Sequence, residues 1–132
     1  MLIIHTDGAC FGNPGPMGIG VAIYRGTHLA KKISEYIGRG TNNIAEYTAV
    51  LRALEAAGEM GEREIEIRSD SLLLINQMNG KFKVKMPHLK ELKAGIENVK
   101  GEMKVKFKWV PREQNTVADL LSKEAIEKEM ER

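Results

Sequence analysis

Cysteine, tryptophan and long apolar runs are scarce in this sequence. Its 132 residues include one cysteine, Cys10, and one tryptophan, and aromatic residues make up 5% of the chain. One cysteine cannot form an internal disulfide, which fits a reducing compartment, so we expect a cytoplasmic protein. No apolar run reaches the ~20 residues needed to cross a bilayer, and the N-terminus lacks the basic-then-apolar pattern of a signal peptide. We therefore expect a globular protein without a membrane partner.

The sequence also has no internal repeat, low-complexity tract or linker-like segment. A chain of this length can bury one hydrophobic core. We therefore predict a single domain over residues 1–132, and we expect it to be a monomer.

Positive charge is unevenly distributed, although the net charge is only +2. Residues 1–80 hold 7 Lys+Arg and 9 Asp+Glu, a net −2. Residues 81–108 hold 9 lysines and 3 glutamates, a net +6, and residues 109–132 hold 4 basic and 6 acidic residues, a net −2. Clustered lysines attract polyanions through counterion release. The segment 81–108 is therefore either a nucleic-acid contact or simply a solvated lysine surface.

The pattern of apolar residues predicts a mixed α/β fold. Alternating and β-branched runs indicate strands, the glycines and prolines of "GNPGP" indicate a turn, and apolar residues at helical spacing indicate helices. Hairpins come first and strand–helix alternation follows, which predicts one mixed sheet with helices on its faces. The expected order is strands at 2–9, 18–25 and 29–38, a helix at 43–58, a strand at 63–70, helices at 71–78 and 87–100, a strand at 104–110 and a helix at 115–132.

Four acidic residues stand apart from the many glutamates expected on helix surfaces. Asp7 lies at or near the end of the first strand, Glu46 in the first turn of the first helix, Asp70 at the end of the fourth strand, and Asp119 near the start of the last helix. Strand ends and helix starts can meet at one sheet edge, where ligands bind. Structural explanations also exist, because Asp70 could N-cap the next helix and Asp119 could favour the helix dipole. Glu46 could form a capping box with Asn43. A charge near a core strand needs a partner, so Asp7 is the hardest to explain in this way.

Together the four acids predict a metal site. Crowded carboxylates repel one another and raise one another's pKa values, and divalent cations remove that cost. Oxygen ligands favour Mg²⁺ or Mn²⁺, whereas a zinc site would use His or Cys, and the histidines at 5, 28 and 88 show no ligand spacing. Two hard ions held by acids suit phosphodiester hydrolysis.

Four segments, in this order, resemble the successive motifs of ribonuclease HI. They are "TDGACFGNPGP", "TNNIAEYTAVLRALE", "IRSDSLLLINQM" and "WVPREQNTVADLLSKEA", and they cover nearly the whole chain. The resemblance implies the ribonuclease H fold, a five-stranded mixed sheet whose second strand is antiparallel to the rest, flanked by helices. It also implies an endonuclease that hydrolyses the RNA strand of RNA–DNA hybrids by two-metal-ion catalysis, with two Mg²⁺ (or Mn²⁺) ions per site when substrate is bound.

The resemblance assigns roles to individual positions. Asp7, Glu46, Asp70 and Asp119 match the family's catalytic, metal-binding acids. Asn13, Asn42 and Asn43 match residues that contact the minor groove of the hybrid, and Arg39 and Thr41 match a pocket for a DNA-strand phosphate. Further substrate contacts are expected from Gly8, Lys85, Arg112 and Asn115.

Three departures from the family pattern affect these roles. The loop "VPREQNTVAD" is short and has no catalytic-loop histidine, and Arg112 is the nearest functional substitute, although its pKa is too high for proton transfer. Arg112 could instead bind phosphate or assist product release, or it could be a solvated loop residue. The basic protrusion is shortened to "NGKFKVKMPHLKEL". Met86 replaces a phosphate-pocket asparagine, for which Lys85 or His88 could compensate. The shortened form without histidine resembles archaeal and some thermophilic members.

Two other functions remain open at this point. One is a relative that cleaves double-stranded RNA, and the other is a module with the same fold that binds hybrids without cleaving them. The four acids favour the enzyme, because a module that only binds nucleic acid would gain nothing from four repelling negative charges near the phosphates. Trp109 is expected in the core, and the C-terminal "SKEAIEKEMER" receives no role.

Overall fold

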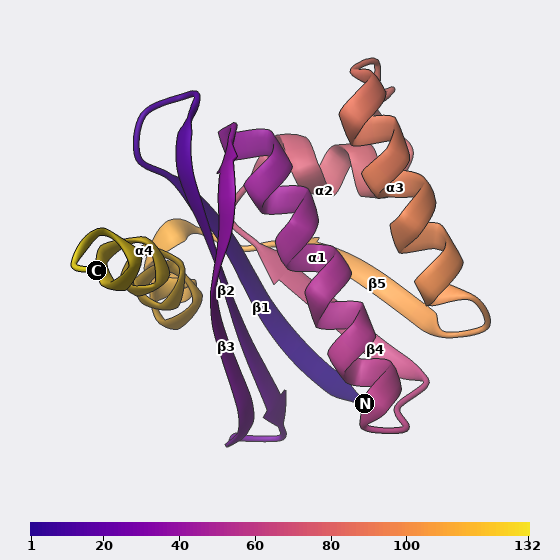
Figure 1. The fold of residues 1–132 in the computed structure, drawn as a ribbon. Coiled ribbons are helices and arrows are strands. Elements are labelled where there is room, and N and C mark those ends of the chain that lie inside the picture. Colours follow the sequence, from indigo (N-terminus) through magenta and orange to yellow (C-terminus); the bar gives the residue numbers. More distant parts are fainter.

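A computed structural model describes residues 1–132 as one sheet flanked by helices (Figure 1). The predicted order of elements is confirmed, with one short 3-10 helix, η1, added before the last helix. The elements are β1 Leu2–Cys10, β2 Gly15–Arg25, β3 His28–Gly40, α1 Asn42–Glu59, β4 Glu64–Ser69, α2 Leu72–Met78, α3 Pro87–Lys100, β5 Lys104–Trp109, η1 Arg112–Gln114 and α4 Thr116–Met130.

The five strands form one mixed sheet in the order β3-β2-β1-β4-β5. β2 is antiparallel to both β1 and β3, whereas β1, β4 and β5 are parallel to one another. The predicted topology, with only the second strand reversed, is therefore confirmed. Parallel neighbours end at the same sheet edge, so the carboxyl ends of β1 and β4 meet there.

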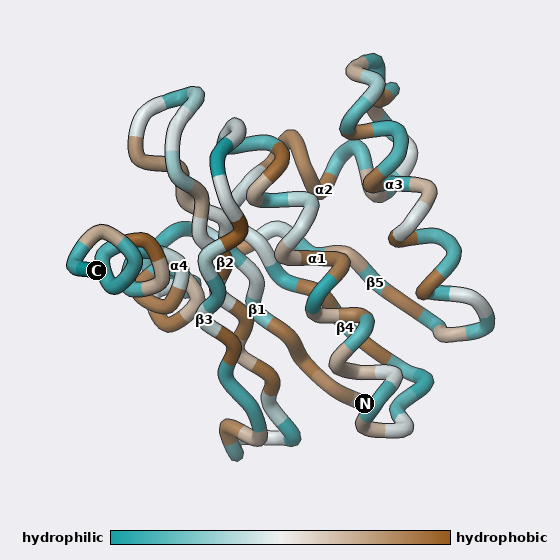
Figure 2. The backbone as a smooth tube through the Cα atoms, in the orientation of Figure 1, coloured by the Kyte–Doolittle hydropathy of each residue, from teal (hydrophilic) through white to brown (hydrophobic).

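Helices cover both faces of the sheet. α1, α2 and α3 lie on one side, and α4 lies on the other, across β1, β2 and β3 (Figure 1). The main core fills the space between α1 and the strands, and Figure 2 shows its apolar stretches along β1 and on α1. Leu2, Ile4, Ile23, Leu54 and Ile67 are fully buried there. Removing such side chains from water stabilises the fold by roughly 1.5–3 kcal/mol each.

Two glycines of β2 determine how closely α4 approaches the sheet. A Cβ atom on Gly20 would lie 2.0 Å from the Ala118 carbonyl oxygen, and one on Gly18 would lie 2.2 Å from the Ser122 carbonyl oxygen. Both distances are far below van der Waals contact. The helix that carries Asp119 therefore packs directly on the backbone of β2.

Several local expectations are wrong. β2 already begins at Gly15, so the turn comprises residues 11–14 and "GNPGP" is only partly a turn. α1 begins at Asn42 and is capped by Thr41, whose side chain accepts a hydrogen bond from the Ile44 N–H (3.3 Å). Glu46 therefore lies in the second turn and forms no capping box with Asn43. Trp109 is 45% exposed rather than buried in the core. No helix has both the length and the apolar character needed to cross a membrane.

Candidate active site

Asp7 and Asp70 are brought together by the parallel pairing of β1 and β4. The last paired residues of the two strands are His5 and Arg68, and both acids lie two positions further along their chains. Asp7 is inside β1, which continues to Cys10, and not at its end. It is only 6% exposed. A carboxylate at this position is largely removed from water, which is costly unless a cation or a proton accompanies it.

Gly8 brings Glu46 close to these two acids. A Cβ atom on Gly8 would lie 2.4 Å from the Ala45 carbonyl carbon, so only glycine lets α1 pack this closely on β1. The Gly8 N–H then donates to Glu46 Oε1 (2.6 Å) and to Asp7 Oδ1 (3.0 Å). This backbone donor, which the sequence assigns to the substrate, is therefore occupied by two of the acids.

Asp7, Glu46 and Asp70 form a compact cluster of carboxylates. Each offers one oxygen atom, and the three atoms lie within 4.8 Å of one another. Burial raises the pKa of Asp7 above its usual value, and repulsion from Glu46 and Asp70 raises it further. Burial also raises the pKa values of Glu46 and Asp70. The site is electrostatically unfavourable in the absence of a cation, as expected for an unneutralised group of acids.

The capping residues leave these carboxylates available. Ser71, and not Asp70, caps α2, because its side chain accepts from the Leu74 N–H (3.3 Å). The structural explanation that the sequence offered for Asp70 is therefore wrong. Asp119 does lie in the first turn of α4, as expected.

Asp119 faces the same cavity from α4 but is already paired with a cation. Lys123 lies one turn further along the helix, and its Nζ donates to Asp119 Oδ2 (3.2 Å). Lys123 belongs to "SKEAIEKEMER", the segment that received no role from the sequence. Its spacing of four residues from Asp119 could have indicated the pair.

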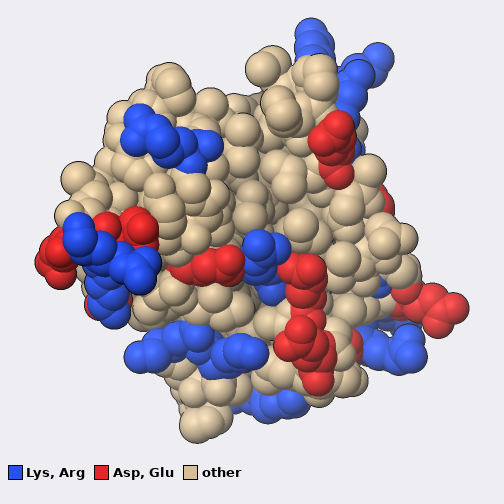
Figure 3. All heavy atoms as spheres, in the orientation of Figure 1, with Lys and Arg blue, Asp and Glu red and all other residues tan.

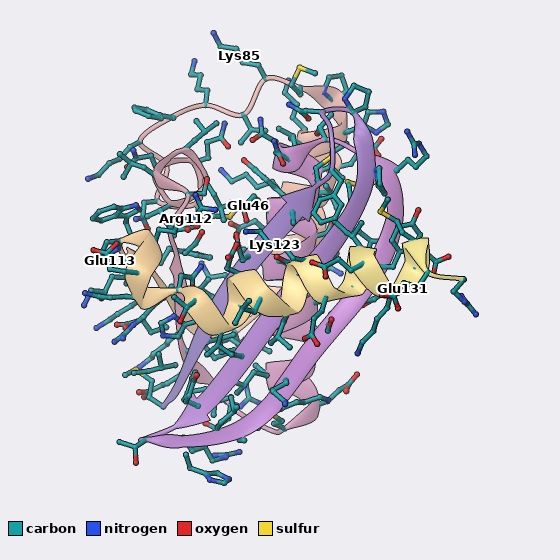
Figure 4. The ribbon with its side chains drawn as sticks, turned by 90° about the vertical axis from the view of Figure 1, so that its left-hand side faces the viewer. Glu46, Lys85, Arg112, Glu113, Lys123 and Glu131 are labelled. Atoms are coloured by element: carbon teal, nitrogen blue, oxygen red, sulfur yellow. The ribbon has the colours of Figure 1, made fainter.

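A cavity of about 590 Å³ joins the four acids to their surroundings. Arg112 of η1 lies at the wall of this cavity. Burial raises the pKa of Asp70, and the positive charge of Arg112 partly opposes that rise. Figure 4 shows Glu46, Arg112 and Lys123 gathered around this site from three different elements. The lining residues are Asp7, Gly8, Ala9, Cys10, Phe11, Asn42, Glu46, Asp70, Ser71, Arg112, Asp119 and Lys123.

The residues expected to contact nucleic acid near α1 lie around one rim of the cavity. The side chain of Asn13 accepts a hydrogen bond from the Asn42 N–H (3.1 Å), which joins the 11–14 turn to the start of α1. Asn43 is exposed beside Asn42, and the exposed Arg39 lies close enough to Cys10 to lower that thiol's pKa against the larger effect of burial. Thr41 is the N-cap, so part of its hydrogen-bonding capacity is used by α1.

Lys85 belongs to a separate, lysine-rich surface. It lies on the segment between α2 and α3, and Figure 4 shows it pointing outward, away from Glu46 and Arg112. Basic side chains also project from the start of α3 in the space-filling view (Figure 3). A second cavity, of about 510 Å³, lies between this segment and α3 and is lined in part by Lys83, Lys90 and Lys93. The segment thus presents several cations to one side of the molecule.

Asn115 lies beneath the site and not on its surface. Its side chain is 1% exposed, and its amide hydrogen-bonds to Thr6 and His5 inside the protein. The expected contact between Asn115 and substrate does not fit this burial. Sequence reasoning gave His5 no role, and no spacing signal in the chain points to it, because the partners are 110 residues apart.

Comparison with known proteins identifies relatives over almost the whole chain. A family model described as "Reverse transcriptase-like" matches residues 5–125. The bifunctional protein Rv2228c of Mycobacterium tuberculosis is 36% identical over 129 residues, which cover 96% of this chain and 35% of that protein. Ribonuclease HI of Halobacterium salinarum is 38% identical over 125 residues, 93% of this chain and 63% of that protein. The chain thus spans about a third of the first of these relatives and less than two thirds of the second.

Solved structures match with the same arrangement of elements. LC11-RNase H1, in complex with an RNA/DNA hybrid, gives a TM-score of 0.94 at 45% identity and covers 98% of this chain and 99% of its own. RNase H1 from the archaeon Halobacterium salinarum gives a TM-score of 0.92 at 35% identity, covering 96% of this chain and 98% of its own.

Proposed function

This chain belongs to the ribonuclease H family, and from that premise we propose that it hydrolyses the RNA strand of RNA–DNA hybrids in a metal-dependent endonuclease reaction. The observation that carries the proposal is the cluster of Asp7, Glu46 and Asp70, whose ligand oxygens lie within 4.8 Å of one another beside an open cavity. A relative with 45% identity was solved with an RNA/DNA hybrid, which supports the same substrate here.

The donor set fits divalent, oxygen-seeking ions. All the clustered groups are carboxylates, and burial first, then repulsion from neighbouring acids, raises the pKa values of Asp7 and Glu46. We propose Mg²⁺, with Mn²⁺ as a substitute, held by Asp7, Glu46 and Asp70, with Asp119 completing the site for a second ion when substrate binds. Such a pair of ions, when bound, activates water and stabilises the leaving oxygen of the phosphodiester.

The protein's own residues orient the reaction around these acids. The Gly8 N–H fixes the Asp7 and Glu46 carboxylates, so two of the ligands are preorganised. Lys123 offsets the charge of Asp119 in the metal-free site, and a bound divalent ion would supply the same compensation. Arg112, at the cavity wall, is placed to hold a phosphate oxygen of the substrate, as guanidinium groups do well. It keeps its proton throughout, so it transfers none.

Substrate binding would extend from the cavity in two directions. On one side, Asn13, Asn42 and Asn43 would contact the minor groove of the hybrid, and Arg39 and Thr41 would hold a phosphate of the DNA strand. On the other side, Lys85 and the neighbouring lysines would add affinity that does not depend on sequence. We further propose that the protein acts as a monomer in the cytoplasm, where a lone Cys10 would stay reduced.

A comparison of four labelled substrates tests this function. The protein is incubated with an RNA–DNA hybrid, an RNA duplex, a DNA duplex and single-stranded RNA at equal ionic strength, with Mg²⁺ or with EDTA. We expect Mg²⁺-dependent internal cuts in the RNA of the hybrid, because reading a 2′-hydroxyl separates RNA from DNA. Cleavage of duplex DNA at the same rate would refute the proposal.

The same assay separates the two alternative functions. Met86, 62% exposed at the N-cap of α3, offers no hydrogen bond to a phosphate. The pocket that would hold a DNA-strand phosphate therefore selects less strictly for DNA in that strand. Slower cleavage of the RNA duplex is therefore compatible with the proposal, and faster cleavage of it would favour the relative that cuts double-stranded RNA. Tight binding of the hybrid without any cut would favour the binding module.

A further inference from the structure

Asn115 connects two elements that carry the acids. Its side-chain Nδ2 donates to the Thr6 carbonyl oxygen (2.9 Å), directly before Asp7 on β1. Its backbone carbonyl oxygen accepts from the Asp119 N–H (3.1 Å) at the start of α4. One buried residue thus joins the strand of Asp7 to the first turn that holds Asp119. A change in the orientation of Asn115 would move these two acids relative to each other.

The Thr6 carbonyl determines which way the Asn115 amide faces, and His5 holds the other end of that amide. The His5 Nδ1 and Asn115 Oδ1 atoms are 3.1 Å apart. Because the Asn115 NH₂ group donates to Thr6, its oxygen must be the atom that faces the ring, and Nδ1 therefore carries the hydrogen. Rotating the amide by half a turn would place its oxygen against the Thr6 carbonyl oxygen, two acceptors with no hydrogen between them. The pair permits only one orientation.

We propose that His5 is a positioning residue for the metal site, which acts by donating from Nδ1 to Asn115 and so fixes the spacing of Asp7 and Asp119. The inference rests on the proposed function, because it concerns the same four acids. His5 touches none of the reacting groups and transfers no proton. Its contribution is to keep the acids in the arrangement that divalent ions require.

The aromatic contact of His5 supports this role. The His5 ring lies edge-on to Tyr24, with ring centroids 5.7 Å apart and planes at 77°. Phenylalanine would make that aromatic contact as well as histidine does. Packing alone therefore does not explain a polar ring at this position.

Two substitutions at position 5 separate hydrogen bonding from packing. His5→Phe keeps the ring against Tyr24 and removes the donor. His5→Asn removes the ring, but its side-chain NH₂ can occupy the place of Nδ1. Three quantities are measured for each protein: the melting temperature in EDTA, the Mg²⁺ and Mn²⁺ concentrations that give half of the maximal rise in melting temperature, and kcat and KM for the hybrid.

We expect opposite results from the two variants. His5→Phe should melt somewhat below the wild-type temperature in EDTA, because the buried Asn115 oxygen loses its donor, and it should need roughly 10-fold more metal, the loss typical when a residue that supports metal ligands is removed. Its kcat at fixed Mg²⁺ should fall while KM for the hybrid stays unchanged. His5→Asn should melt at a lower temperature yet keep a metal requirement within about 2-fold of wild type. Tyr24→Leu, the matched control, should lower only the melting temperature.

The outcomes that overturn the inference are distinct from those that overturn the function. An unchanged metal requirement in His5→Phe refutes the role of His5, as does a requirement that simply follows melting temperature across all variants. If His5→Phe does not fold, Asn115→Ala removes the same hydrogen bond and must show the same shift. If the wild type binds metal but cuts no hybrid, the proposed function fails, and the metal titrations still decide the role of His5.

Discussion

At the scale of single residues, the site is a balance between repulsion and fixed geometry. Three carboxylates share a small volume, and burial first, then repulsion between acids, raises their pKa values. The Gly8 N–H and Lys123 offset part of that cost. Divalent ions would offset the rest, which is why each acid is expected to matter far more for activity than for folding.

Replacing Asp70 with asparagine should abolish most activity without harming the fold. A neutral amide cannot balance the charge of a divalent ion, so hydrolysis of the hybrid should fall by ~10³-fold or more, about 4 kcal/mol. Since Ser71 caps α2, no helix cap is lost. The melting temperature in EDTA should stay the same or rise, because one repelling charge is gone. Glu64→Gln, exposed at the start of β4, the strand that precedes Asp70, should leave activity unchanged. Substantial turnover by the Asp70 variant at millimolar Mg²⁺ would show that the site is misassigned.

Arg112 should assist catalysis without being essential. Its side chain borders the cavity and its charge acts on Asp70, but it provides no metal ligand. Arg112→Ala should therefore reduce kcat/KM by ~10-fold, about 1.4 kcal/mol. Glu113→Ala, at the next position of the same 3-10 helix, controls for disturbance of η1. A loss as large as that of Asp70→Asn would mean that Arg112 is a principal catalytic group, and no loss would mean that it is only a solvated loop residue.

At the scale of elements, the contact between α4 and β2 determines where Asp119 lies. Gly20→Ala would place a methyl group 2.0 Å from the Ala118 carbonyl oxygen, so α4 must move away. We expect a loss of about 1–3 kcal/mol in the free energy of unfolding, measured by urea denaturation, and a weaker response to Mg²⁺. Gly95→Ala is the control, because its nearest neighbour would lie at 3.9 Å and a helix gains from alanine. Equal stability of the Gly20 and Gly95 variants would contradict this account.

The elements themselves could be predicted from the sequence, but their local details could not. The alternation in "REIEIRSD" and the helical spacing in residues 43–58 arise because one face of each element is buried. The strand and the helix that they predict are therefore both found in the fold. The predicted cap of α1, Asn43, is wrong because Thr41 and Asn43 are both good capping residues, and only the backbone conformation decides which of them caps the helix. The expectation that Trp109 lies in the core is wrong because a bulky residue at a strand end can face either way. Its Nε1 donates to the Asp70 carbonyl oxygen (3.2 Å) at the surface.

The candidate site shows the same division. Asp70 follows a strand and Asp119 lies at a helix start, as predicted, whereas Asp7 lies inside β1 and Glu46 in the second turn of α1. The motifs locate all four in the chain. The Asn115–His5 pair does not follow, because it depends on a distance between residues 110 positions apart. Contacts of this kind leave no periodic signal in a single sequence.

The segment between α2 and α3 should bind the substrate mainly through charge. Lys81, Lys83 and Lys85 are exposed there. If each neutralises one phosphate, changing all three to alanine should reduce the slope of log K against log[salt] by roughly 2 to 3. A triple substitution of equal charge elsewhere, at Lys31 and Lys32 near the start of β3 and at Lys100, the last residue of α3, should change the slope far less. If both triples behave alike, the segment has no specific contact with nucleic acid.

At the scale of the whole molecule, charge is separated between the acidic cavity and the lysine-rich segment. The net charge of +2 hides this arrangement. Lysines beyond the cavity attract the polyanion, while the acids at its centre would repel it unless divalent ions are present. Substrate binding and metal binding are therefore expected to support each other, since each reduces the repulsion that opposes the other.

The same acids should make the stability of the metal-free protein fall as pH rises. In the folded state the pKa of Asp7 is raised from 3.8 to about 10 and that of Glu46 from 4.5 to about 7, chiefly by burial. Above pH 4 the folded protein therefore keeps protons that the unfolded chain has lost, and the free energy of unfolding decreases with pH. The decline should extend from about pH 4 through pH 7 and above, at about 1.4 kcal/mol per pH unit for one proton difference. His5, whose pKa is lowered by burial, acts in the opposite sense near neutral pH, but it is one group against at least two.

Urea denaturation at pH 5, 6, 7 and 8 measures this dependence. In EDTA the midpoint should fall steadily across the series. With saturating Mg²⁺ the decline should largely disappear, because bound cations stabilise the deprotonated acids in the folded state only, and a ligand of the folded state raises its stability. Asp7→Asn should flatten the EDTA curve without any metal, since it removes the most strongly shifted carboxyl group. A midpoint that rises with pH in EDTA would mean that the acids are not packed together in the folded protein, and the metal site built on them would fail with it.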